Sequence, residues 1–178
     1  MVLRNYEFKS AASDIEYLEK KLLGLNPVFK GEDHQTDTYF NINTGRLKLR
    51  EGNIEHALIF YERPEINSAR QSDVILYSHE PGKGLKELLA KALGVKAVVD
   101  KIRRIYFVDN VKFHFDKVAG LGTFIEVEAI ARDPEASTES LKRQCEEYIS
   151  FFGLDQSAFI GKSYCDLLTE ESEGRGRV

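Results

Sequence analysis

The chain is poor in the residues that mark disulfide-rich, zinc-binding and membrane proteins. Its 178 residues include two cysteines, four prolines, one methionine and no tryptophan. Cys145 and Cys165 have no spacing suited to a zinc site or a disulfide framework, so we expect both to be reduced. No apolar run approaches the roughly 20 residues of a membrane-spanning helix, and Asn5, Glu7 and Lys9 stand where a signal peptide would be apolar. The sequence predicts a cytoplasmic protein that does not bind membranes.

The chain also lacks a strong excess of charge of one sign. Charged residues make up 30% of it, yet the formal net charge is only −4, so we expect no nucleic-acid partner. A chain of 178 residues with 42% hydrophobic content can bury one substantial core. We predict one domain over residues 1–169. The end, 170–178, is charged and contains glycine and a single apolar residue, which predicts a disordered tail.

Alternation of polar and apolar residues is the strongest pattern in the chain. Neighbouring side chains of a strand point to opposite faces, and this period predicts strands near 2–9, 34–42, 46–52, 56–63, 72–79, 98–109, 111–118 and 123–132. Apolar spacings of three and four predict helices at about 11–23, 84–93 and 137–152. These strands are enough for a barrel.

The polar faces of several predicted strands carry charge of one sign. Arg46, Lys48 and Arg50 share one face, for example, and Glu126 and Glu128 share another. A sheet with a solvated polar face is the common explanation of such alternation, but solvated faces usually mix lysine with glutamate. Like charges on one face repel each other unless a polyanion or facing carboxylates offset them. The segregation of sign therefore favours a closed barrel whose charged faces meet in a polar interior.

Short motifs follow one another in a fixed order along the chain. They are Asn5-Tyr6-Glu7-Phe8-Lys9, Gln35-Thr36-Asp37-Thr38-Tyr39-Phe40, Gly45-Arg46-Leu47-Lys48-Leu49-Arg50, Val99-Asp100-Lys101-Ile102-Arg103-Arg104-Ile105-Tyr106, the segment 116–128 with Gly120-Leu121-Gly122 and Glu126-Val127-Glu128, and Ser163-Tyr164-Cys165-Asp166-Leu167-Leu168. In this order they resemble the CYTH superfamily, the triphosphate tunnel metalloenzymes, which includes class IV adenylyl cyclases and thiamine triphosphatases. The resemblance spans nearly the whole chain.

The resemblance implies an α+β fold in which an antiparallel eight-stranded barrel, with helices packed outside, binds a small-molecule triphosphate or nucleotide. Its carboxylates would bind Mg²⁺ or Mn²⁺, which suits hard cations, and the matching positions are Glu7, Asp116, Glu126 and Glu128. Its basic residues would bind phosphate oxygens, and the matching positions are Lys9, Arg46, Lys48, Arg50, Arg63, Arg70, Lys101 and Arg103. The catalytic residues expected among these are Glu7, Lys9 and Arg50.

Three functions fit this pattern. The first is hydrolysis of a nucleoside triphosphate, thiamine triphosphate or inorganic tripolyphosphate, which requires the fewest additional groups. The second is cyclisation of ATP to cyclic AMP and pyrophosphate, and the third is binding without turnover. Asn5 removes one carboxylate from the first motif, and Glu62 stands where many relatives have lysine. These departures keep the binding function open, and the sequence leaves the choice between monomer and homodimer open.

Two kinds of residue near the predicted site are expected to serve the fold. His114 shares a face with Lys112 and Asp116, and a lone histidine is more often a structural hydrogen-bond partner than a catalyst. Tyrosines in strands more often fill a core than stack on a base, which applies to Tyr39, Tyr61, Tyr106 and Tyr164.

Overall fold

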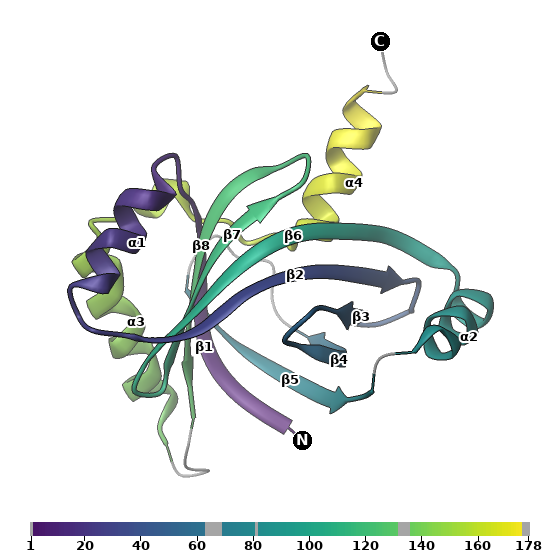
Figure 1. Cartoon of the computed structure of the whole chain (residues 1–178), viewed down its shortest axis with the longest axis horizontal. Coiled ribbons are helices and arrows are strands. Elements are labelled where there is room, and N and C mark those ends of the chain that lie inside the picture. Colours follow the sequence, from purple (N-terminus) through teal and green to yellow (C-terminus); the bar gives the residue numbers. More distant parts are fainter. Residues whose placement is uncertain (1, 63–68, 81, 132–135, 176–178) are drawn as a thin grey trace.

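The computed structural model describes residues 2–62, 69–80, 82–131 and 136–175. Its strands are β1 (Val2–Ala11), β2 (Val28–Phe40), β3 (Arg46–Glu51), β4 (His56–Glu62), β5 (Arg70–Ser78), β6 (Val95–Val108), β7 (Val111–Val118) and β8 (Gly122–Ile130). They form one closed antiparallel barrel in the order β1-β5-β4-β3-β2-β6-β7-β8 (Figure 1). Strand β1 closes it by pairing with β5 on one side and β8 on the other. The predicted α+β barrel is confirmed.

Four α-helices and one short 3₁₀ helix lie outside the strands of the described chain. They are α1 (Ile15–Leu23), α2 (Lys83–Leu93), α3 (Thr138–Phe152), the 3₁₀ helix η1 (Gln156–Ala158) and α4 (Tyr164–Arg175). Figure 1 shows α1 and α3 beside each other on one side of the barrel, while α2 lies at the opposite side. Helix α4 projects from the barrel above β6 in this view. The first three α-helices correspond to the three predicted ones.

Helix α4 differs from the sequence-based expectation, because the predicted disordered tail is helical as far as Arg175. Tyr164 and Cys165 are buried at the start of α4, so its first turn is fixed by packing. Lys162 Nζ lies 2.5 Å from Glu170 Oε1, and this ion pair joins the loop before α4 to a later turn of the helix. Glutamate is a good helix former, and a helix with an anchored start extends easily through such residues. Residues 176–178 lie outside the described part of the chain.

Two apolar clusters fix the barrel. The outer cluster packs Ile15, Leu18 and Leu22 of α1 and residues of α3 against the outward faces of β1, β7 and β8, where Phe113 and Val127 are fully buried. The inner cluster includes aromatic side chains from several strands together with Tyr164 and Cys165 of α4. Because successive strand residues alternate between faces, the residues between the outward apolar ones point into the barrel.

The turn from β7 to β8 shows how local chemistry shapes the barrel. Gly120 and Gly122 have φ angles of 78° and 98°, a region that side chains with a Cβ rarely adopt. The turn pairs Val118 with Gly122 and sets the register that places His114 opposite Glu126. Within the described ranges, no helix is both long and apolar enough to cross a membrane.

Candidate functional site

A cavity of about 530 Å³ occupies the inside of the barrel. All eight strands contribute side chains to its wall, and most of the charged ones are nearly inaccessible to solvent. The lining residues that the sequence singled out are Glu7, Lys9, Lys48, Arg50, Lys101, Arg103, Glu126 and Glu128. Closure of the barrel thus brings Lys48 and Arg50 of β3 and the acidic pair of β8 to one shared space.

Asp37 is the centre of the basic half of the cavity. Arg50 donates to both of its oxygens at 2.8 and 2.9 Å, Lys101 approaches to 2.7 Å and Lys48 to 3.1 Å. Burial alone raises the pKa of Asp37, but the charges of Arg50, Lys101 and Lys48 hold it well below its usual range. Burial, with Arg50 and Arg103 nearby, lowers the pKa of Lys101 to about 7. Asp37 therefore keeps three basic side chains converged on one point.

Arg103 joins the basic half of the cavity to the acidic half. Its Nε donates to Asp116 at 2.6 Å, and its Nη2 donates to Glu126 at 2.8 Å. Tyr164 of α4 donates from its hydroxyl to Asp116 at 2.7 Å. Lys9 of β1 lies 3.9 Å from Glu126 and 4.0 Å from the centre of the Tyr164 ring. The side chain that begins α4 is therefore part of the inner wall.

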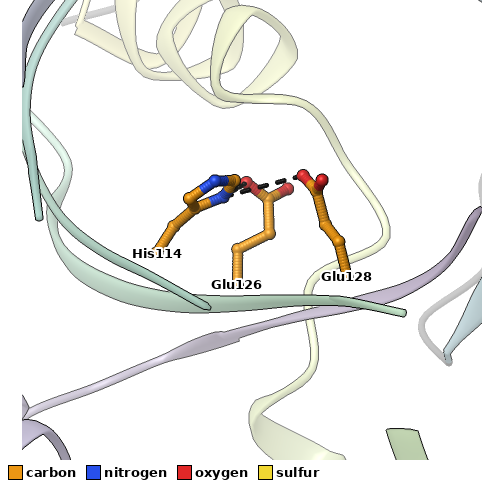
Figure 2. Close-up of side chains that lie close together, drawn as sticks. All are labelled: His114, Glu126 and Glu128. Atoms are coloured by element: carbon orange, nitrogen blue, oxygen red, sulfur yellow. Dashed lines mark hydrogen bonds and ion pairs between the residues drawn. The ribbon is translucent and has the colours of Figure 1, made fainter. Parts of the chain in front are cut away.

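An acidic group with one histidine lies on β7 and β8. His114, Glu126 and Glu128 each offer a ligand atom, and these atoms lie within 4.8 Å of one another. Figure 2 shows the three side chains rising to one side of the strands, with His114 directed at both carboxylates. Its Nδ1 is 3.2 Å from Glu126 and 3.6 Å from Glu128. Glu7 extends the group, because it is the neighbour of Glu128 on β1.

The electrostatics of this group suit a divalent cation. Burial, reinforced by the negative charges of Glu126 and Glu7, raises the pKa of Glu128 to about 7. Burial also lowers the pKa of His114 to about 3, so the imidazole is neutral at neutral pH. Carboxylates that repel each other in a buried site are stabilised by a bound cation, and carboxylate oxygens are the donors that Mg²⁺ and Mn²⁺ prefer. The donor set therefore fits either ion.

The wall formed by β4 and β5 has a different character. Ala57, Ile59 and Tyr61 of β4 and Val74 and Leu76 of β5 line the same cavity. Ile59 pairs with Leu76 across the two strands, and Tyr61 pairs with Val74, so the apolar side chains form one continuous patch. The cavity therefore has a charged part and an apolar part.

The remaining predicted site residues lie elsewhere. Asp116 is fully buried, where Arg103 and Tyr164 bind it. Arg46 donates to Asp166 of α4 at 2.9 Å. Arg70 begins β5, and nothing is described of its side chain; Arg63 lies outside the described residues.

Sequence reasoning missed Asp37, Glu55 and Lys112 as members of the site. Asp37 could have been found, because alternation places it on one face with Gln35 and Tyr39. Lys112 had the same signal, on one face with His114. Glu55 precedes β4 in the turn after β3, where no periodicity indicates the direction of a side chain.

The first comparison with known proteins concerns the family. Residues 3–152 match the model of the CYTH domain, which is more than half of the chain. This chain belongs to the CYTH family. The family assignment agrees with the charged barrel interior and with the order of the motifs.

Individual relatives cover almost the whole chain. MJ0240 of Methanocaldococcus jannaschii, named as a candidate adenylate cyclase, is 26% identical over 90% of this chain and 96% of its own length. Adenylate cyclase CyaB of Aeromonas hydrophila is 27% identical over 89% of this chain and 85% of its own. These names support an enzyme role for the CYTH protein described here.

Solved structures share the barrel. The PH1012 protein of Pyrococcus horikoshii superposes with a TM-score of 0.79 at 25% identity, covering 92% of this chain and 98% of that one. HpAC1 from Hippeastrum, described as having a dominant triphosphatase activity, gives a TM-score of 0.64 at 15% identity, covering 95% and 96% of the two chains. At that identity the likeness to HpAC1 concerns the fold alone.

Proposed function

We propose that this CYTH protein is a divalent-metal-dependent hydrolase that acts on a small-molecule triphosphate bound inside the barrel. One observation carries the proposal: basic side chains of β1, β3, β6 and β7 and carboxylates of β1 and β8 line a single cavity. A triphosphate chain with its metal ion needs both kinds of group within a few ångströms, because the phosphates are anionic and the ion needs oxygen ligands.

The proposed roles follow from position. Lys9, Lys48, Arg50, Lys101 and Arg103 hold the phosphate oxygens, since all five are buried or half-buried cations that line the cavity. A terminal phosphate group carries more negative charge than a carboxylate. It can therefore bind the basic side chains that Asp37 holds together.

The metal ligands proposed are Glu7, Glu126 and Glu128, and Asp116 supports them through Arg103. When bound, Mg²⁺ or Mn²⁺ would neutralise charge that develops on the phosphate oxygens. Glu7 would orient the water that attacks the terminal phosphorus. The bond between that phosphorus and its bridging oxygen breaks, releasing inorganic phosphate, the diphosphate and a proton. Lys9 and Arg50 would stabilise the charge that develops during this step.

The apolar patch supports an organic triphosphate over inorganic tripolyphosphate. Phosphate oxygens gain nothing against Ile59, Val74 and Leu76, whereas a carbon-rich or aromatic group is stabilised there by about 25 cal/mol per Å² of apolar surface removed from water. A nucleoside or thiamine triphosphate could place its phosphates among the cations and its organic part against β4 and β5.

The names of the two curated relatives favour a second candidate, ATP cyclisation. In that reaction the ribose 3′-hydroxyl attacks the α-phosphorus, and pyrophosphate leaves. The same cations and carboxylates would serve both reactions, which differ in the attacking oxygen and in the phosphorus that it attacks.

One panel of assays separates these functions. Purified protein is incubated with Mg²⁺ or Mn²⁺ and with ATP, thiamine triphosphate or tripolyphosphate, and the released phosphate, pyrophosphate and cyclic AMP are measured. Free phosphate without cyclic AMP is the expected result. Equal amounts of pyrophosphate and cyclic AMP would show that the protein is a cyclase and not a hydrolase. Metal-dependent binding of a triphosphate without any product would show that the protein binds its ligand without turnover. The absence of both binding and product would refute the proposal.

A further inference from the structure

Glu55 makes contacts that the proposed reaction does not use. Its Oε1 accepts from Lys112 Nζ at 2.6 Å, and its Oε2 accepts from Arg50 Nη1 at 2.9 Å and from Gln35 Nε2 at 3.1 Å. Arg50 belongs to β3 and Lys112 to β7, which β2 and β6 separate in the barrel. One carboxylate from the β3–β4 turn therefore bridges two cations on different walls of the cavity.

We propose that Arg50, Lys112 and Gln35 form a phosphate subsite, and that the Glu55 carboxylate fills it until a phosphorylated ligand displaces it. The inference rests on the proposed function, since it assumes a phosphate-bearing ligand in the cavity. It adds a binding subsite, with Lys112 as a new member, and it assigns to Glu55 the role of an internal competitor.

The backbone of Glu55 is fixed, so displacement needs only a rotation of its side chain. Asp33 is fully buried and accepts from the backbone N–H groups of Asn53, Ile54 and Glu55 at 2.6, 2.9 and 3.1 Å. The side chain of Glu55 itself is 27% exposed. Glutamate has several staggered rotamers of similar energy, and a partly exposed carboxylate can turn towards water.

The chemistry of the subsite suits a phosphate. Arg50 offers a planar guanidinium whose Nε and Nη2 bind Asp37, which leaves Nη1 directed at Glu55. Lys112 supplies a second, compact charge opposite it. Burial raises the pKa of Glu55, but Lys112 and Arg50 outweigh burial and hold the pKa far below its usual range, so the carboxylate is anionic. A terminal phosphate carries about −1.5 to −2 at neutral pH and binds the same donors more strongly than a carboxylate does.

Two consequences for ligand binding follow. An incoming phosphate must break the bonds of Glu55, and the displaced carboxylate then repels it. Ligands of low charge are therefore disfavoured at this subsite, while a terminal phosphate with two negative charges can displace the carboxylate.

The test is Glu55→Gln, which keeps the size of the side chain and removes its charge. Binding of inorganic tripolyphosphate is measured by calorimetry at constant ionic strength with EDTA present, so that metal ions do not contribute. We expect about tenfold tighter binding than in the wild-type protein, which corresponds to about 1.4 kcal/mol. The matched control is Glu51→Gln: Glu51 is in the same hairpin but bonds Lys86 of α2 at 2.7 Å, and its variant should bind as the wild type does.

Thermal melts of the same proteins give a second readout. Without ligand, Glu55→Gln should melt below the wild type, because Arg50 and Lys112 lose a counter-ion, and tripolyphosphate should raise its melting temperature more than that of the wild type. Adding Lys112→Gln to Glu55→Gln should remove most of the gain in affinity.

The possible failures are distinguishable. If wild type and Glu55→Gln bind tripolyphosphate equally, or if the variant binds it more weakly, the subsite is refuted while the proposed function stands. If neither protein binds tripolyphosphate or ATP, with or without Mg²⁺, the proposed function fails and the subsite with it. If Lys112→Gln leaves the affinity of Glu55→Gln unchanged, Lys112 is not a member of the subsite, and the inference is overturned.

Discussion

Replacing Asp37 by asparagine tests whether this carboxylate holds the basic half of the cavity together. Asp37 is 1% exposed and accepts bonds from Arg50, Lys48 and Lys101. Removing one partner from a buried ion pair costs about 3–5 kcal/mol, because the remaining charge stays buried without compensation. Asparagine keeps one acceptor oxygen, so we expect a loss of about 3 kcal/mol in the free energy of unfolding. For a domain of this size this equals about 6–12 °C in melting temperature.

The assay is urea unfolding followed by circular dichroism, with Asp100→Asn as the matched control. Asp100 bonds His34 at 3.1 Å, but its side chain is 51% exposed, so its variant should lose less than about 0.5 kcal/mol. A polyanion can replace the missing negative charge, and saturating tripolyphosphate should therefore stabilise Asp37→Asn more than the wild type.

The dependence on pH provides an internal check of the same prediction. The pKa of Asp37 is lower in the folded than in the unfolded protein, so its contribution to stability is complete above about pH 5 and is lost as the pH falls. The difference between wild type and Asp37→Asn should therefore shrink as the pH falls below about 4. A variant within about 1 kcal/mol of the wild type, or one no less stable than Asp100→Asn, would refute the proposed role.

Three further predictions concern other parts of the cavity. Glu126→Gln should bind Mn²⁺ at least about tenfold more weakly by electron paramagnetic resonance and lose turnover; unchanged Mn²⁺ binding would exclude Glu126 as a ligand. The pKa of Lys101 is lowered to about 7, so metal-free tripolyphosphate binding should weaken as the pH rises from 7 to 9 in the wild type and stay level in Lys101→Arg. A level wild-type profile would contradict this. Tyr164→Phe removes the hydroxyl that binds Asp116 and should cost about 1–2 kcal/mol in urea unfolding, whereas Tyr77→Phe, at a residue 65% exposed, should cost less than about 0.5 kcal/mol.

Alternation in the sequence was sufficient to predict the barrel and much of its inner wall. Lys48 and Arg50 share a face with each other because strand geometry is local, and the same rule groups Glu126 with Glu128. The rule could have added Asp37, whose place between Gln35 and Tyr39 puts it on an inward face. Arg63 lies outside the described residues, so its role as a phosphate ligand stays a prediction.

Helix α4 extends into the segment whose composition predicts a disordered tail. Glutamates and glycine after residue 169 are typical of a disordered tail. The helix forms because Tyr164 and Cys165 are buried at its start, and that burial depends on a cavity wall made by strands far away in the sequence.

The amino-acid sequence by itself determined which residues share a strand face, because the direction of a side chain depends only on its position along the strand. Only the tertiary structure decided which charges meet. Asp37 faces Lys101 across 64 positions, Arg46 turns to Asp166 rather than to the cavity wall, and Glu55 reaches Lys112 from a turn. These pairs depend on strand order, register and closure of the barrel, and no local pattern in the sequence records them.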